Sequence, residues 1–454
     1  MTRSPAVPRD RDRPVDRRTL LAAGATAVVA GCSGSKHETL DVRDSGAVAT
    51  NVFGAPTQAV LTKLLDRRAA ALKAGDERAF LADLDPSNAQ LVAGQRRLLA
   101  NLRQFDVARF SLVPGPTPLE PKDGAYSVDV TQLVRLTADV GPDGVASCEQ
   151  FTYQLVAQGE RWLVRDIQLP RNSIPAPWSL TRLTVTRAEN VYLAADATAP
   201  DLSRYAAVAP AEARRVETIW KGRPHFPGYV LFFSRDAKTL GAWYSPVGRR
   251  FDEASRFEGW VPWGSYADAS GADYSTEASS AARVVVNLSA MDHVFDRREV
   301  PALIRHELTH AITARVAPSP GAGFGLSRWV AEGYARFVEY AVDPSRRAAE
   351  FRQVKAGVAR GWFTGTPPDS AHFYDKTKIG FNYSLSSTVF HFVGTQKGPA
   401  AATDFYAGAQ QILDGATVGV PYLTSKAFDG VCRVVTGLSA KAFLAEWSSY
   451  VRSI

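Results

Sequence analysis

The sequence predicts an α+β protein with two folded parts, on three observations. Residues 57–105 repeat apolar side chains at spacings of three and four, as amphipathic helices do. Strand-like runs follow between residues 107 and 169, and helices followed by an antiparallel sheet make an α+β domain. From residue 297 onward the pattern is again mainly helical. A chain of 454 residues is long enough for two or three such domains.

The first part contains four strand-like runs that favour a curved antiparallel sheet. The runs are VARFSLVP, AYSVDVTQLVRLT, CEQFTYQLVAQ and RWLVRDIQL, and Gly159-Glu160 between the last two is a short hairpin signal. The order of elements and the ending GERWLVRDIQ resemble the nuclear transport factor 2-like cone fold over residues 55–170. The resemblance implies a cone-like domain. We find no convincing acid–base pair in its sequence, so binding or packing is its expected role.

The second part is expected over residues 180–454, after a proline-rich linker at 170–179. LTRLTVTRAENVYLAA predicts two strands, the stretch 200–222 a helical region, and GYVLFFS another strand. Residues 247–280 are rich in Ser, Ala, Gly and Asp and predict a long loop. ARVVVNLSA, at 282–290, is a strong β-branched strand, either at the edge of a sheet or in its interior.

The first 31 residues predict a signal peptide rather than folded structure. A charged stretch precedes the apolar run TLLAAGATAVVAG, which is far shorter than the ~20 residues of a membrane span. The end of this run, VAGC, resembles the bacterial lipobox, which implies a lipid on Cys32 and an extracytoplasmic protein anchored to the cell membrane. Arg17-Arg18 also resembles a twin-arginine export signal, and a general secretory route stays open. Residues 32–54 are expected to be a flexible tether.

Charge and cysteine content exclude several classes of protein. The formal charge is +7, and six Arg against three Asp in residues 1–31 supply +3 of it, which leaves a mild and scattered +4. We therefore expect no nucleic-acid partner. Three cysteines rule out a disulfide-dense scaffold. Cys148 and Cys432 remain after residue 32, and two separate buried thiols are favoured over a bridge.

The stretch RHELTH places two of the seven histidines four positions apart. On an α-helix this spacing projects His306 and His310 from one face, a turn apart, so that both imidazoles reach one metal ion. Glu307 lies about 100° round the helix, where it can face a water without ligating the metal. Asp296 is the expected cap of this helix. The alternative is an amphipathic helix with structural histidines. Catalytic zinc needs a third protein ligand.

Glu332, in SRWVAEGYARFVEY, is the expected third ligand. HELTH followed by WVAEGYARFVEY resembles the gluzincin zinc metallopeptidases, over roughly residues 280–454. The resemblance implies a zincin-like domain, one Zn²⁺ on His306, His310 and Glu332, and Glu307 as the general base that activates water. Glu339, seven positions after Glu332, is an alternative ligand, and is favoured as a hydrogen-bonding support for a ligating histidine.

The same resemblance implies a donor for the oxyanion of peptide hydrolysis. Tyr383, at the start of GFNYSLSSTVFHFV, is the favoured donor, and His372 and His391 are its competitors. A Gly-x-Met-Glu-Asn segment, which reads a free amine in the aminopeptidase branch, has no convincing counterpart before the zinc helix. If RVVVNL is an edge strand, it pairs with an extended peptide substrate.

The sequence therefore predicts a lipid-anchored, extracytoplasmic zinc metallopeptidase that hydrolyses peptide or protein substrates. The rival hypothesis is a catalytically silent lipoprotein that keeps the peptidase fold for binding or as a scaffold. In a third hypothesis the cone-like domain is the functional part, and it binds a small ligand or a peptide. The presence of Glu307 favours the enzyme, because a silent site tolerates its loss.

Overall fold

Three helices open the described chain, as the three- and four-residue spacing of apolar side chains predicts. They are α2 (Gln58–Ala74), α3 (Glu77–Leu81) and α4 (Ala89–Leu102). Thr57, Asp76 and Asn88 cap their starts, and each side chain accepts a hydrogen bond from a main-chain N–H three residues on. Gly75 ends α2 in the left-handed conformation, with a φ of 70°.

The four predicted strands of the first part form an antiparallel sheet behind these helices. They are β1 (Val107–Pro114), β2 (Tyr126–Leu136), β3 (Ala146–Gln158) and β4 (Arg161–Gln168). The predicted hairpin is confirmed, because Gln158 pairs with Arg161 and Gly159 takes a φ of 60° between them. Apolar side chains from α2, α4 and the strands, such as Leu65 and Phe151, form one buried cluster.

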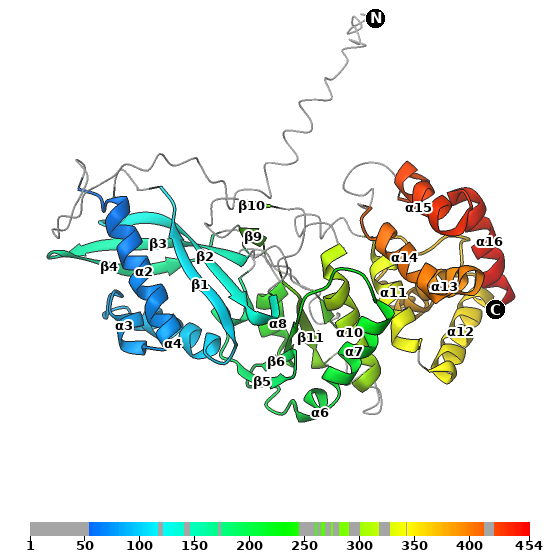
Figure 1. Cartoon of the computed structure of the whole chain (residues 1–454), viewed down its shortest axis with the longest axis horizontal. Helices are drawn as coiled ribbons and strands as arrows, with labels where there is room; N and C mark the ends of the chain where they lie inside the picture. The colour runs from blue at the N-terminus through cyan, green and yellow to red at the C-terminus, as the bar shows by residue number, and fades with distance from the viewer. Residues whose placement is uncertain are drawn as a thin grey trace, which may run out of the picture.

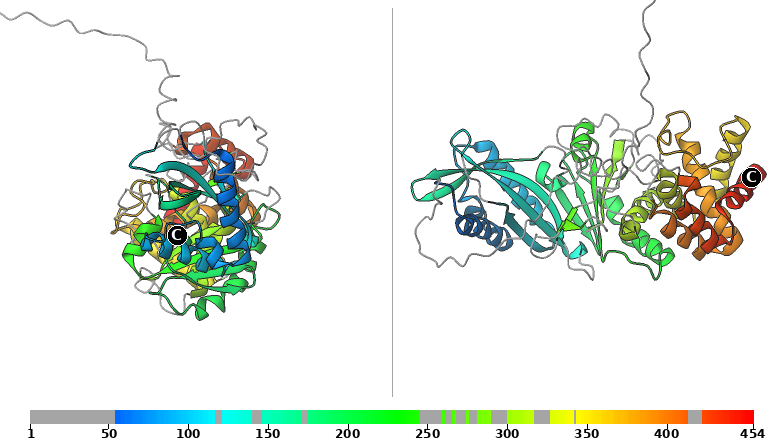
Figure 2. Two further views of the ribbon diagram at one scale, coloured as in Figure 1. Left: turned by 90° about the vertical axis from the view of Figure 1, so that its left-hand side faces the viewer. Right: turned by 90° about the horizontal axis from the view of Figure 1, so that it is seen from above.

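The computed structural model covers the whole chain, and its described residues are 54–116, 121–139, 146–170, 173, 175–244, 259–260, 265–267, 274–275, 281–289, 300–316, 327–341, 343–412 and 422–454. The predicted signal peptide, Cys32, nearly all of the tether and the predicted cap Asp296 lie outside them. Three parts follow one another along the long axis in Figures 1 and 2. The first sheet lies at one end, a second sheet in the middle, and a helical part at the other end.

The second sheet has the strand order β5-β6-β7-β11-β8. Its strands are β5 (Thr184–Ala188), β6 (Val191–Ala195), β7 (Tyr229–Ser234), β11 (Arg283–Asn287) and β8 (Gly259–Trp260). β6, β7 and β11 are parallel, and every residue of these three strands is buried. Continuous apolar runs suit strands that are covered on both faces. β11 is an interior strand, so of the two alternatives for RVVVNL the edge position is wrong.

The few described residues of the predicted loop at 247–280 form three short strands, which differs from the expectation. Besides β8, these are β9 (Ser265–Ala267) and β10 (Tyr274–Ser275). β9 pairs with the first residues of β3, where Ala146 faces Ala267, and β10 pairs with β9. A sheet edge offers unpaired N–H and C=O groups, so it can order a segment whose own sequence has little strand preference.

The first and second parts share one buried cluster of side chains. Phe105 of the first part lies against Trp178 and Tyr192, with ring centroids 5.7 and 5.6 Å apart. Arg283 of β11 donates to Asp139 at 2.7 Å, and both side chains are almost fully buried. The proposed boundaries at 170 and 180 stay a prediction, and the apolar core continues across them.

The helical end of the molecule confirms the prediction for the chain after residue 297. The described residues of this region form seven α-helices in order: α10 (Val300–Thr313), α11 (Arg328–Tyr340), α12 (Pro344–Ala359), α13 (Ile379–Lys397), α14 (Pro399–Ala409), α15 (Lys426–Thr436) and α16 (Ala440–Ser453). The α+β class is therefore confirmed, with a mostly helical C-terminal half. Cys148 and Cys432 are two separate buried thiols, as predicted. None of the described helices has the length and apolar character needed to cross a membrane.

Candidate metal centre

Helix α10 is buried on nearly all sides, which fixes the two histidines it carries. It packs against α7 (Ala209–Ile219) on one side and α11 on another. Arg305, next to His306, donates from Nε to Glu212 of α7 at 2.7 Å, and both side chains are at most 5% exposed. Arg305 also donates to the main-chain carbonyl of Glu339 on α11. One arginine therefore ties the histidine helix to both α7 and α11.

Helix α11 holds Glu332 in place through very close packing against α13. Gly333 lies against Ser386, and a Cβ added to the glycine would come within 2.7 Å of the serine Cβ and 2.8 Å of its carbonyl oxygen. Only glycine allows the two helices to approach so closely at this point. The glycine that follows Glu332 in the sequence thus sets the distance between α11 and α13.

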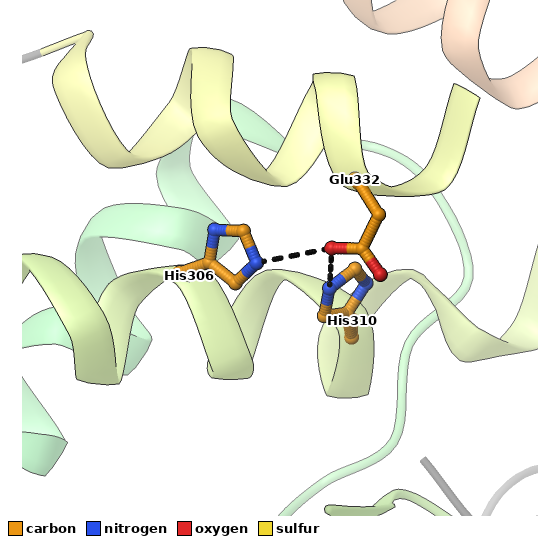
Figure 3. Close-up of side chains that lie close together, drawn as sticks. All are labelled: His306, His310 and Glu332. Carbon is orange, nitrogen blue, oxygen red and sulfur yellow. Dashed lines mark hydrogen bonds and ion pairs between the residues drawn. The ribbon is translucent and has the colours of Figure 1, made fainter. Parts of the chain in front are cut away.

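The structure brings His306, His310 and Glu332 together. Figure 3 shows the two imidazoles on α10 and the carboxylate reaching them from α11. Oε2 of Glu332 lies 3.3 Å from Nε2 of His306 and 3.4 Å from Nε2 of His310. One donor atom from each residue lies within 4.8 Å of the other two. In the described part of the chain, this is the one such group of three His, Cys, Asp or Glu residues.

These three donors fit a divalent metal ion such as zinc. Two imidazole nitrogens and one carboxylate oxygen are a common ligand set of catalytic zinc, with bonds of about 2.0–2.2 Å. A tetrahedral ion with bonds of about 2.1 Å sets its ligand atoms about 3.4 Å apart. The two distances from Glu332 Oε2, 3.3 and 3.4 Å, match that spacing. Two His and one Glu leave a fourth position for water or substrate.

The charges of the cluster favour a cation at its centre. Burial by itself lowers the pKa of His306, but hydrogen bonds with Glu332 and Glu339 outweigh it and hold the pKa well above its ordinary value. Burial raises the pKa of Glu332, but His310 and His306 hold it far below its usual range. A carboxylate that stays ionised while buried needs a positive partner, which a metal ion provides.

Glu339 supports His306 from the side opposite Glu332. Its Oε2 lies 3.2 Å from Nδ1 of His306, so the histidine presents Nε2 to the centre of the cluster. Arg336 donates to both oxygens of Glu339, at 3.0 and 2.9 Å. Burial raises the pKa of Glu339, but Arg336 and His306 together lower it below the usual range. This position agrees with the expected supporting role rather than with metal ligation.

The predicted base and oxyanion donor both lie beside the cluster. Glu307 is 1% exposed, and its charge is among the groups that raise the pKa of His306. The Tyr383 ring centroid lies 6.2 Å from that of His306. The competing histidines are placed differently. His372 is exposed and hydrogen-bonded to Asp369, and His391 is buried, with its ring 4.9 Å from that of Phe337. The catalytic roles stay predictions.

Tyr374 belongs to the site and was missed by the sequence reasoning. Its hydroxyl donates to Oε1 of Glu332 at 3.0 Å, which fixes the carboxylate oxygen that does not face the histidines. Burial and the charge of Glu332 raise the pKa of Tyr374, so the hydroxyl remains a donor. Tyr374 lies in the turn before α13, nine positions before Tyr383, and no periodic pattern marks it.

In comparisons with known proteins, only solved structures match this chain. No protein-family model matches the chain, and no curated protein matches it. Among solved structures, a two-domain M1 zinc metallopeptidase variant bound to L-tryptophan is 13% identical, with a TM-score of 0.33, and the match covers 75% of this chain and 69% of that one. An M1 zinc metallopeptidase from Deinococcus radiodurans is 14% identical, with a TM-score of 0.30 and the same coverage. TM-scores this low do not establish a shared fold, so the site stands on its own geometry.

Proposed function

We propose that the chain is a zinc metallopeptidase, held on the extracytoplasmic face of a bacterial cell membrane by a lipid on Cys32. The observation that supports the peptidase most strongly is the position of Glu332. Its Oε2 atom lies 3.3 Å from Nε2 of His306 and 3.4 Å from Nε2 of His310. The helix that carries these two histidines also carries Glu307. Two ligands and a base on one helix, with a third ligand from the next, form the donor set of a hydrolytic zinc site.

In this proposal His306, His310 and Glu332 hold the zinc ion. Bound there, zinc supplies a Lewis acid that polarises a peptide carbonyl and makes water more acidic. Glu307 takes a proton from the attacking water and returns it to the amine that leaves. Tyr383 donates a hydrogen bond to the oxyanion that forms on the carbonyl. Glu339 and Tyr374 keep His306 and Glu332 in position throughout.

The proposed substrate is an extended peptide, cleaved within the chain. The sequence before the zinc helix has no convincing counterpart of a segment that recognises a free amine, which favours an endopeptidase. β8 is one of the two edge strands of the second sheet. It contacts the histidine helix and pairs with β11 through Trp260 and Gly259. A peptide that extends this sheet would therefore pair with β8 rather than with RVVVNL.

Metal analysis of the purified chain, together with a cleavage assay, tests the enzyme. We expect about one zinc per chain, cleavage of casein or of a peptide library, and loss of cleavage in Glu307→Gln with the zinc retained. Zinc binding without cleavage of any substrate would favour the silent scaffold. A chain that binds no metal would overturn the proposal.

Membrane anchoring needs a separate experiment, because Cys32 lies outside the described residues. Wild type and Cys32→Ser are expressed in a bacterial host, and the membrane and soluble fractions are compared. We expect the wild type in the membrane fraction with a covalent lipid, and the variant without lipid and released from the membrane. A wild-type chain that carries no lipid would disprove the anchor and leave the peptidase proposal intact.

A further inference from the structure

Arg328 is a cation at the edge of the site that forms no ion pair with a carboxylate in the described part of the chain. It is the first residue of α11, one helical turn before Glu332, and it is only partly buried. In the part of the chain that the structure describes, no carboxylate lies within 4.0 Å of its guanidinium. Its guanidinium carbon lies 4.6 Å from the centre of the Tyr374 ring. Tyr374 and the more distant charge of Glu332 stabilise this guanidinium, and its five N–H donors leave room for a carboxylate ligand as well.

The other arginines around the site differ in this respect. Arg305 is paired with Glu212, and Arg336 is held by Glu339. Both are far more buried than exposed, and their partners belong to neighbouring helices or to the same helix. They therefore serve the packing of α10 and α11. Arg328 has an aromatic ring beneath it instead, which positions the guanidinium without neutralising its charge.

A wall of aromatic rings connects Arg328 with the metal ligands. The Tyr374 ring is 6.5 Å from the Tyr383 ring, which in turn is 6.2 Å from His306. Burial lowers the pKa of Arg328, but Tyr374, Glu332 and Tyr383 outweigh burial and raise it. The guanidinium therefore interacts electrostatically with the groups that surround the metal ligands. Side chains one helical turn apart have Cβ atoms about 5–6 Å apart. An extended peptide advances ~3.3–3.6 Å per residue, so Arg328 reaches a group within about two residues of the cleaved bond.

We propose that Arg328 binds a carboxylate of the peptide, so that the site prefers substrates with a negative charge within about two residues of the cleaved bond. This inference rests on the proposed peptidase function and adds the substrate class to it. Guanidinium and carboxylate form charge-assisted, often bidentate hydrogen bonds, and Arg is suited to them by its planar fork of donors. The carboxylate comes either from an acidic side chain or from the C-terminus of the peptide, and the experiment distinguishes the two.

Peptide binding to the zinc-loaded mature chain tests the proposal, with Glu307→Gln as the background so that the probe is not turned over. Fluorescence anisotropy compares three versions of one labelled hexapeptide. One has Glu at an internal position and an amidated end, one has Gln there and a free C-terminus, and the third, with Gln and an amidated end, is the neutral partner of both. Arg328→Gln is the test variant, Arg328→Lys keeps the charge without the planar fork, and Arg352→Gln is the control at an exposed arginine of α12.

We expect Arg328→Gln to weaken binding of a carboxylate peptide at least tenfold, and to leave its neutral partner unchanged. Arg328→Lys should keep part of the preference, and Arg352→Gln all of it. If Arg328→Gln weakens binding of the internal Glu peptide, the carboxylate comes from an acidic side chain. If it weakens binding of the peptide with a free C-terminus, the carboxylate is the terminal one. Equal weakening of charged and neutral peptides, or no effect on either, would overturn the inference and leave Arg328 a packing residue.

A parallel cleavage assay separates this inference from the proposed function. Wild type is given the same peptides, and cleavage is followed by mass spectrometry. Cleavage without any charge preference overturns the role of Arg328 alone. Binding that depends on Arg328, with no cleavage of any peptide, overturns the peptidase alone and leaves a carboxylate-binding site. Circular dichroism and thermal melts of each variant confirm that the compared chains are folded.

Discussion

Oε2 of Glu339 lies 3.2 Å from Nδ1 of His306, while Nε2 of the same ring faces Glu332 at 3.3 Å. The imidazole is therefore held at both nitrogens by carboxylates from one helix, α11. A ligating histidine needs its free nitrogen directed at the metal, and a hydrogen bond at the other nitrogen supplies that orientation. Glu339 also connects His306 to Arg336, which anchors the carboxylate in turn.

Glu339→Gln should therefore weaken zinc binding by about 10- to 100-fold, because the amide is a poorer partner for the histidine. Competition with a chelator of known affinity measures the change. Glu350→Gln is the matched control, since Glu350 is the other buried carboxylate near Arg336, at 3.3 Å from Nε. The zinc affinity of the Glu350→Gln variant should equal that of the wild type. Equal losses in both variants would mean that the effect comes from Arg336 and not from His306.

Gly333→Ala should destabilise the protein by about 1–3 kcal/mol, because the added methyl group overlaps Ser386 on α13. Urea unfolding measures the change. Gly430→Ala on α15 is the control, since nothing lies within 4 Å of its added Cβ, and alanine there should stabilise by about 0.5–1 kcal/mol. A Gly333→Ala chain as stable as wild type would show that α11 and α13 can separate at no cost.

Glu212→Gln should cost about 3–5 kcal/mol, because it leaves the buried Arg305 without its counter-charge. The loss should appear in the unfolding free energy measured in urea. Glu77→Gln provides the comparison at an exposed ion pair, with Arg96, where the expected loss is below ~1 kcal/mol. Similar losses in the two variants would contradict the view that Arg305 ties α10 to α7 electrostatically.

The buried Glu149 predicts a dependence of stability on pH. Burial raises the pKa of this carboxyl above its usual range, although Ala176, Trp178, Gln132 and Ser179 donate hydrogen bonds that act in the opposite direction. A raised pKa means tighter proton binding in the folded protein than in the unfolded one. The stabilisation is thus complete below the unfolded pKa of about 4.3 and is lost as the pH rises through the folded value.

Glu149→Gln removes this titration, so the unfolding free energies of wild type and variant are compared across the same pH range. As the pH rises from about 4 to about 7, the difference should move in favour of the variant. Urea unfolding at each pH provides the measurement. A difference that does not change with pH would show that Glu149 has the same proton affinity in the folded and unfolded chains.

Most of the helices and strands could be predicted from the sequence, because each depends on a pattern within one segment. The runs VARFSLVP and RWLVRDIQL became β1 and β4 almost residue for residue. The loop at 247–280 is the exception. The strands β8, β9 and β10 within it are short. β8 and β9 pair with β11 and β3 from other parts of the chain, and β10 pairs with β9. No local pattern contains that information.

For the site, the sequence by itself determined the helix with His306 and His310 and offered Glu332 and Glu339 as candidates from the next helix. The spacing of residues on a helix is a local property, so the faces of both helices could be derived. Only the tertiary structure decided which carboxylate faces Nε2 and which faces Nδ1 of His306, and it added Tyr374 and Arg328. Those relationships depend on how closely α11 approaches α10 and α13, and that distance is set by packing contacts such as Gly333 against Ser386.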